Sequence, residues 1–162
     1  MARRPPLIAV CGTSKEEPAA IRDAEQVGEL LAARGALVVC GGHGGVMAAV
    51  ARGVRARGGT AVGLLPGDDP DDASEDITLA LPTGLGEMRN SLIAHCCRAL
   101  IAIGGGYGTL SEIGFALRIG RPVVGLHTWD IRRAGDDSPD ISLHRVDTPQ
   151  QAVDWVLSHA PH

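Results

Sequence analysis

Short apolar runs alternate with longer segments of mixed polarity along this chain. The run at 99–103, Ala-Leu-Ile-Ala-Ile, contains no polar residue, a pattern typical of a strand that helices cover on both faces. Four similar runs and one more polar run occur elsewhere. We therefore predict six strands, at 7–11, 36–40, 60–65, 76–81, 99–103 and 122–126.

Apolar residues three or four positions apart indicate helices between these strands. We predict helices over 14–34, 46–57, 84–97, 109–117 and 148–157. Ser14 with Glu17, and Thr148 with Gln151, fit capping boxes, while Thr109 is a natural N-cap. Alternation of strands and helices indicates right-handed βαβ units. The predicted class is α/β, a three-layer, Rossmann-like, doubly wound parallel sheet in a single domain over residues 1–162.

Two segments show no regular pattern. Residues 66–76 contain five Asp and one Glu, but their spacing matches no EF-hand, so we favour an acidic loop over a cation site. Residues 127–140 are predicted to form an irregular loop.

Composition narrows the choice of compartment and partner. The 162 residues carry a net charge of −4, which provides no general attraction for nucleic acid or for an anionic membrane. Arg3 and Arg4 precede an apolar run, but 7–10 is too short for a signal peptide, and no run is long enough to span a membrane. We expect a cytoplasmic protein.

Cysteine, histidine and lysine usage argues against several chemistries. Cys11, Cys40, Cys96 and Cys97 contain no Cys-x-x-Cys pair, and the six histidines lack metal-ligand spacing, so no metal site is predicted. Lys15 is the only lysine. Its position excludes a Walker A motif and argues against Schiff-base chemistry with pyridoxal phosphate.

Three predicted strands end in glycine-rich turns. In a parallel sheet these turns meet at the carboxyl edge, and a glycine turn that opens a helix binds anions through backbone N–H groups. Neither longer turn spells G-x-G-x-x-G, so a dinucleotide held in the usual way is not expected. We predict a phosphate site formed by Gly12, Thr13, Ser14, Gly41, Gly42, Gly44, Gly45, Gly105, Gly106, Gly108 and Thr109.

Two charged residues near this edge have more than one interpretation. Arg89 lies on the apolar stripe of its helix and in the first turn, where a cation is disfavoured, so it either binds an anion or forms an internal salt bridge. Glu112 either completes a capping box with Thr109 or acts as a carboxylate beside the phosphate turn.

Two aromatic residues and one histidine also lie near the turns. Tyr107 either closes over a ligand or shields its turn, and Trp129 either stacks on a planar base or anchors its loop. Nothing local decides whether His43 faces ligand or solvent.

With these residues assembled, the chain resembles the Lonely-guy and molybdenum-cofactor-carrier-like superfamily, which is related to DNA-processing protein A. The resemblance covers about 7–126. It depends on the motifs Cys-Gly-Thr-Ser at 11–14, Gly-Gly-His-Gly-Gly-Val-Met at 41–47, Met-Arg-Asn at 88–90 and Gly-Gly-Gly-Tyr-Gly-Thr-Leu-Ser-Glu at 104–112. Gly104 and Ser111 depart from the enzymes' motif, which has proline and a second acid at these positions, and they are similar to the carrier-like branch.

The resemblance implies hydrolysis of the N-glycosidic bond of a nucleoside 5′-monophosphate, with Arg89 and Glu112 as catalytic residues. It adds Met47, Asn90 and Tyr107 to the ligand-binding set. Alternatively, it implies a non-catalytic carrier of a phosphorylated pterin, the molybdenum cofactor, or of a nucleotide. The resemblance implies neither a required cofactor nor lysine decarboxylase activity. The bound ligand that it implies is a nucleotide or molybdopterin. The relatives imply a homodimer or higher homo-oligomer, and the acidic charge makes DNA binding the weakest hypothesis.

Overall fold

The computed structural model describes residues 4–138 and 142–161. One sheet of parallel strands has the order β4-β3-β2-β1-β5-β6-β7. The strands are β1 (Leu7–Gly12), β2 (Leu37–Cys40), β3 (Ala61–Leu65), β4 (Leu79–Pro82), β5 (Ala99–Ile103), β6 (Val123–Leu126) and β7 (Leu143–Val146). The wholly parallel pairing confirms the predicted α/β, Rossmann-like class.

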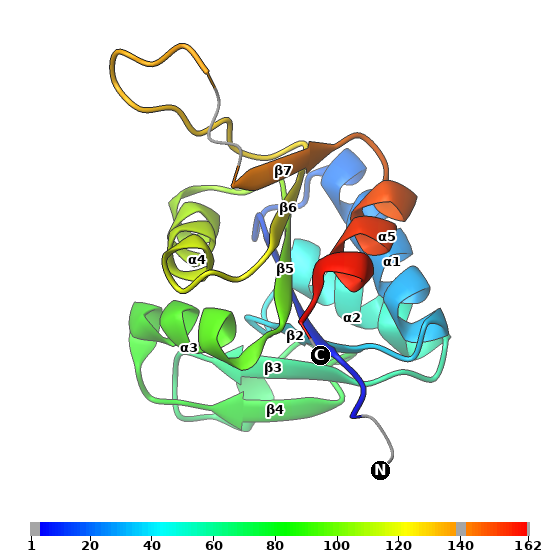
Figure 1. Ribbon diagram of the computed structural model, residues 1–162. Helices are drawn as coiled ribbons and strands as arrows, with labels where there is room; N and C mark the ends of the chain where they lie inside the picture. Colours follow the sequence, from blue (N-terminus) through cyan, green and yellow to red (C-terminus); the bar gives the residue numbers. More distant parts are fainter. Residues whose placement is uncertain (1–3, 139–141, 162) are drawn as a thin grey trace.

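Helices cover both faces of this sheet (Figure 1). The helices are α1 (Pro18–Ala33), α2 (Val46–Ala56), α3 (Arg89–Cys96), α4 (Tyr107–Arg118) and α5 (Pro149–His159), with short 3₁₀ turns η1 (Pro70–Asp72) and η2 (Gly86–Met88). Helices α1, α2 and α5 pack on one face, while α3 and α4 pack together on the other. The three layers agree with the prediction.

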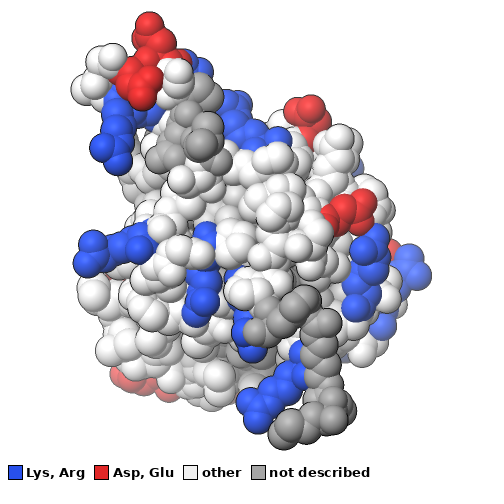
Figure 2. Space-filling model, in the orientation of Figure 1, with Lys and Arg blue, Asp and Glu red and all other residues white. Residues whose placement is uncertain are grey.

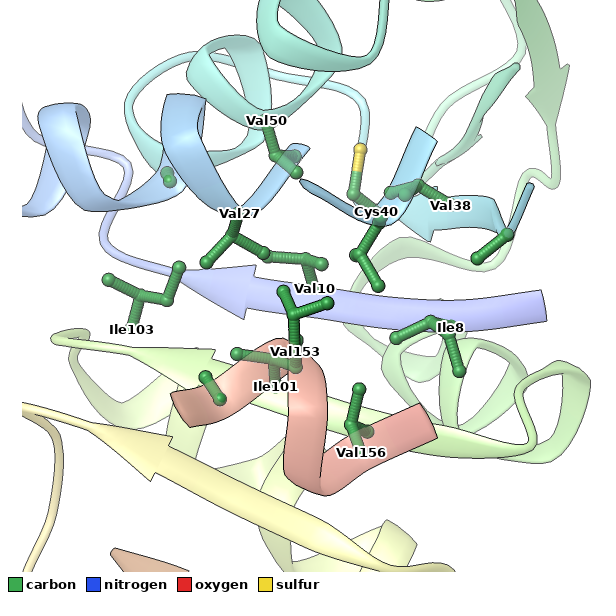
Figure 3. Close-up of a cluster of buried hydrophobic side chains, with 14 of the residues drawn as sticks. Ile8, Val10, Val27, Val38, Cys40, Val50, Ile101, Ile103, Val153 and Val156 are labelled. Carbon is green, nitrogen blue, oxygen red and sulfur yellow. The ribbon is translucent and has the colours of Figure 1, made fainter. Parts of the chain in front are cut away.

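The alternation of side chains along each strand divides the core in two. Ile8 and Val10 of β1 belong to the cluster under α1, α2 and α5, where Figure 3 shows Val10 close to Val27 and Val153. Ala9 and Cys11 belong to the cluster under α3 and α4. Cys11, the last of these positions before the strand ends, therefore lies on the face that α4 covers.

The sheet contains one strand more than we predicted. β7 pairs with β6 at the outer edge, and its sequence Leu-His-Arg-Val buries only its first side chain. A short, polar edge strand carries no apolar run for the sequence to reveal. β4, the opposite edge strand, begins at Leu79, later than the predicted 76–81. The predicted irregular loop at 127–140 ends outside the described residues.

Two helices begin later than predicted. The capping box of Ser14 and Glu17 does not form, because α1 starts at Pro18 with Glu17 as an N-cap that makes no side-chain capping bond. The segment 84–97 is not one helix, because Gly84 and Gly86 have φ of 64° and 57°, outside the right-handed helical region. By contrast, the capping box of Thr148 and Gln151 is present.

The surface carries scattered charge. On the face shown in Figure 2, basic side chains are separated by uncharged surface and form no continuous band. Among residues 4–138 and 142–161, no helix is both long and apolar enough to cross a bilayer.

Candidate functional site

The turns that follow β1 and β5 open into a common cavity. β1 pairs with β2 on one side and with β5 on the other, so the connections leave the sheet in opposite directions between β1 and β5. This is the switch point at which α/β sheets bind ligands. The cavity has a volume of about 440 Å³ and is lined by Cys11, Gly12, Thr13, Ser14, Lys15, Glu17, His43, Met47, Glu87, Arg89, Asn90, Gly105, Gly106, Tyr107, Gly108, Thr109 and Glu112.

The N-terminus of α4 forms one wall of the cavity. The helix begins at Tyr107 with Gly106 as N-cap, so Thr109 lies in the first turn and is not the predicted cap. The first intrahelical bond runs from Leu110 N–H to the Gly106 carbonyl, and the N–H groups before it have no partner within the helix. Gly105 has a φ of 102°, and a Cβ there would collide with the Thr109 side chain, so this turn requires glycine. This end of α4 can receive an anion.

Glu112 points into the cavity from the second turn of α4. Only 7% of the residue is exposed. Burial raises the pKa of its carboxyl to about 7, although a hydrogen bond from Cys11 and the charge of Arg89 both lower it, and Glu87 adds a smaller increase. Because α4 starts before Thr109, the alternative capping box with Thr109 is not formed. Glu112 can therefore exchange a proton near neutral pH.

Arg89, the first residue of α3, also lines the cavity and is buried, with 8% of the residue exposed. Its Nη1 donates hydrogen bonds to the carbonyls of Gly41 (2.6 Å) and Leu64, at the ends of β2 and β3. Its Nε donates to Asn90 Oδ1 at 2.9 Å. Among the described residues, no ion pair includes Arg89. Arg89 therefore does not form the internal salt bridge that we considered with any of them.

A chain of hydrogen bonds joins Arg89 to the first turn of α4. Asn90 accepts from Arg89 and donates through Nδ2 to Ser111 Oγ at 3.1 Å. The Ser111 hydroxyl donates in turn to the Gly108 carbonyl at 2.6 Å. The guanidinium is thus held in a fixed position relative to the first turn of α4 before any ligand binds.

Side-chain charge in the cavity is mixed. Glu17, Glu87 and Glu112 line it together with Lys15 and Arg89. A bound phosphate would therefore depend on backbone N–H groups and the α4 dipole as much as on cationic side chains. No group of three or more His, Cys, Asp or Glu side chains arranged for a metal ion occurs within 4–138 and 142–161.

The second glycine turn lies at the expected edge of the sheet, because β2 is parallel to β1. His43 and the predicted Met47 line the cavity, but Gly41, Gly42, Gly44 and Gly45 do not. Instead, the Val46 N–H donates to the Thr13 carbonyl at 2.9 Å, which closes this turn against the first one. The Gly41 carbonyl contributes indirectly, because it accepts from Arg89.

The sequence reasoning also missed lining residues. Cys11, Lys15, Glu17 and Glu87 line the cavity but were not among the predicted site residues, and His43, which was left undecided, lines it too. Two of them carried a signal that we did not use: Cys11 directly precedes the first glycine turn, and Glu87 lies two residues before Arg89.

The raised pKa of Glu112 predicts that stability falls between about pH 4.5 and 7. In this range the unfolded chain has lost the proton and the folded chain retains it, so raising the pH favours unfolding. A difference of about 2.5 pH units corresponds to about 3 kcal/mol. Urea unfolding at pH 5 and pH 8 should show that Glu112→Gln loses about 2.5 kcal/mol less than the unmodified protein, because part of the change already lies below pH 5. Equal losses in the two proteins would contradict this assignment.

Comparison with known proteins supports this fold and shows the family. The model of the SLOG cluster4 family (LDcluster4) matches residues 5–153. An uncharacterised protein of Archaeoglobus fulgidus is 36% identical over 154 residues, which cover 93% of this chain and 94% of that protein. A probable cytokinin riboside 5′-monophosphate phosphoribohydrolase of Oryza sativa subsp. japonica is 37% identical over 129 residues, or 74% of this chain and 52% of the rice protein. The chain thus spans about half the length of that relative.

Solved structures give the same answer at the level of the fold. The molybdenum cofactor binding protein of Rippkaea orientalis has a TM-score of 0.85 and 28% identity, over 97% of this chain and 98% of that one. The molybdenum cofactor carrier protein of Chlamydomonas reinhardtii has a TM-score of 0.81 and 28% identity, over 96% and 98%. DNA processing protein A of Helicobacter pylori shares the fold alone, at 18% identity and a TM-score of 0.72, over 97% and 82%. Since the family model spans residues 5–153, the chain belongs to the SLOG cluster4 family, which confirms the superfamily that its motifs suggested.

Proposed function

We propose that this protein binds a nucleoside 5′-monophosphate and hydrolyses its N-glycosidic bond, releasing the base and ribose 5-phosphate. One observation carries the proposal: a buried carboxyl with a pKa of about 7, that of Glu112, shares a cavity with the open N-terminus of α4 and the fixed guanidinium of Arg89. The phosphoribohydrolase relative supports the same chemistry.

In this proposal the phosphate binds to the N–H groups at the start of α4, with the Thr109 hydroxyl beside them. Arg89 orients the sugar and phosphate. Cleavage of the bond from C1′ to the base nitrogen leaves the electron pair on the base, which takes a proton from solvent, and positive charge develops on the ribose. The ionised Glu112 stabilises that charge and accepts a proton from the water that attacks C1′.

Incubation with AMP and with cytokinin-type nucleotides is the direct test. Chromatography should detect free base together with ribose 5-phosphate. Adenosine, which has the same bond but no phosphate, should react at least about 100-fold more slowly, because phosphate binding energy positions the bond. Equal rates for AMP and adenosine would contradict the phosphate site, and no release from any nucleotide would contradict hydrolysis.

We propose as a second candidate a carrier of a phosphorylated pterin. Two observations favour it: the similarity to molybdenum cofactor proteins over nearly the whole chain, and the neutral link of Asn90 and Ser111 where the enzymes' motif has a second acid. Pterin fluorescence in the purified protein, or saturable binding of molybdopterin without turnover, would support this function. Turnover of AMP with no affinity for pterin would exclude it.

We also propose a homo-oligomer. The exposed side chains of Leu85, directly before η2, of Met88, its last residue, and of Leu92 on α3 lie near Arg89 in the sequence. Apolar surface next to a binding site is typical of protein interfaces. Light scattering should give a mass of at least twice 16.8 kDa, and a monomer at high concentration would contradict the proposal.

A further inference from the structure

An aromatic pair, the exposed Tyr107 and the half-buried Trp129, stands at the rim of the cavity. Tyr107, the first residue of α4, is 82% exposed. Its ring centroid lies 5.7 Å from that of Trp129, with an angle of 35° between the rings. Only 2% of the residues are aromatic, yet one of them is exposed beside a cavity. An exposed apolar surface of this kind commonly marks a ligand-binding site.

The loop that carries Trp129 is attached to the proposed phosphate turn. Trp129 Nε1 donates to the Gly106 carbonyl at 3.1 Å, and the Thr128 hydroxyl donates to the Gly104 carbonyl. His127 begins the loop with a φ of 51°, and its ring lies 3.5 Å from the Asp23 carboxylate. These contacts fix the aromatic pair relative to the N-terminus of α4.

A second hollow adjoins the cavity at this point. It has a volume of about 460 Å³ and is lined by Glu17, Gly104, Gly105, His127, Thr128, Trp129 and Asp130. Glu17 and Gly105 line both hollows, Tyr107 lines the first, and Trp129 lines the second. The aromatic pair therefore lies where the two hollows meet.

We propose that Tyr107, supported by Trp129, stacks against a fused two-ring heterocycle, a purine or a pterin, of the ligand whose phosphate lies at the start of α4. The inference rests on the proposed phosphate site and adds a subsite for the ring. Stacking of a base on an aromatic side chain contributes substantially to affinity without requiring hydrogen-bond readout. A pair with centroids 5.7 Å apart offers more surface than a single ring does, which suits a two-ring system better than a pyrimidine.

Binding of AMP and of ribose 5-phosphate tests the subsite, because the two ligands share the phosphate and differ in the ring. Glu112→Gln serves as the parent protein, so that little AMP is hydrolysed during titration. AMP should bind about tenfold more tightly than ribose 5-phosphate. Tyr107→Leu should remove most of that ratio and leave the Kd of ribose 5-phosphate unchanged within about twofold. A neopterin monophosphate, titrated in parallel, shows whether a pterin or a purine gains more from the pair.

Tryptophan fluorescence gives an independent readout. The chain has two tryptophans, so in Trp155→Phe the emission comes from Trp129 alone, and AMP should change it while ribose 5-phosphate should not. Trp155→Leu is the matched control, because Trp155 stacks between His144 and His159 and lines neither hollow, and it should keep the tenfold ratio. Equal affinity for AMP and ribose 5-phosphate, or an unchanged ratio in Tyr107→Leu, would overturn the subsite while leaving the phosphate site intact. Failure of the unmodified protein to bind either ligand would overturn the proposed function and the subsite together.

Discussion

Replacing Glu112 with glutamine should lower the rate of base release by at least about 100-fold. The amide has nearly the same size, but it carries no negative charge to stabilise the developing cation and cannot accept the proton of the attacking water. Nucleotide affinity should change by less than about threefold, because the phosphate binds to the backbone of α4. The measurement is kcat for AMP, with Kd from calorimetry on the same variant.

Glu87→Gln is the matched control for this change. Glu87 also lines the cavity, but it lies on η2, and its charge only slightly raises the pKa of Glu112. We expect this variant to retain kcat within about threefold. If both variants lose activity to the same extent, or if Glu112→Gln retains it, the role assigned to Glu112 is wrong.

Replacing Arg89 with methionine should reduce both stability and ligand binding. The carbonyls of Gly41 and Leu64 would lose a charged donor in a buried position. An unsatisfied buried group costs about 1–3 kcal/mol, so the free energy of unfolding should fall by about 2–4 kcal/mol. Affinity for AMP should fall at least tenfold, because Arg89 is the only buried cationic side chain among the described residues that line the cavity. Urea unfolding and calorimetry measure the two effects.

Arg118→Met makes the same substitution at an exposed position in the last turn of α4. The free energy of unfolding should fall by less than about 1 kcal/mol, the size of a favourable helix-dipole interaction. A similar loss of stability in the two variants would show that the carbonyl contacts of Arg89 contribute little.

The sequence predicted the parts of this fold that depend on local pattern. Apolar runs such as that of β5 and glycine turns at strand ends are visible in the sequence because each one needs only its own residues. Parallel pairing then brings the turns after β1 and β5 to one edge, as expected. The family, too, was predictable from the motifs around Arg89 and Glu112.

The remainder depends on contacts between distant segments. No local feature of the turn around Gly41 indicates that it closes against Thr13, and none indicates that Arg89 donates to strand-end carbonyls instead of meeting a carboxylate. Likewise, Cys11 and Glu112 are about 100 positions apart, and only the side-chain alternation of β1 and the start of α4 bring them together. The capping box of Thr109 and Glu112 does not form for the same reason, since the glycine turn sets the start of α4.

The two outer strands have a consequence for solubility. β4 and β7 are each four residues long, and β4 ends at Pro82, which has no N–H to offer to a further strand. β7 places His144 and Arg145 in exposed positions. Short edge strands of this kind discourage another chain from extending the sheet. We therefore expect no fibrous aggregation through the exposed Leu79 and Leu81 of β4, even at high protein concentration.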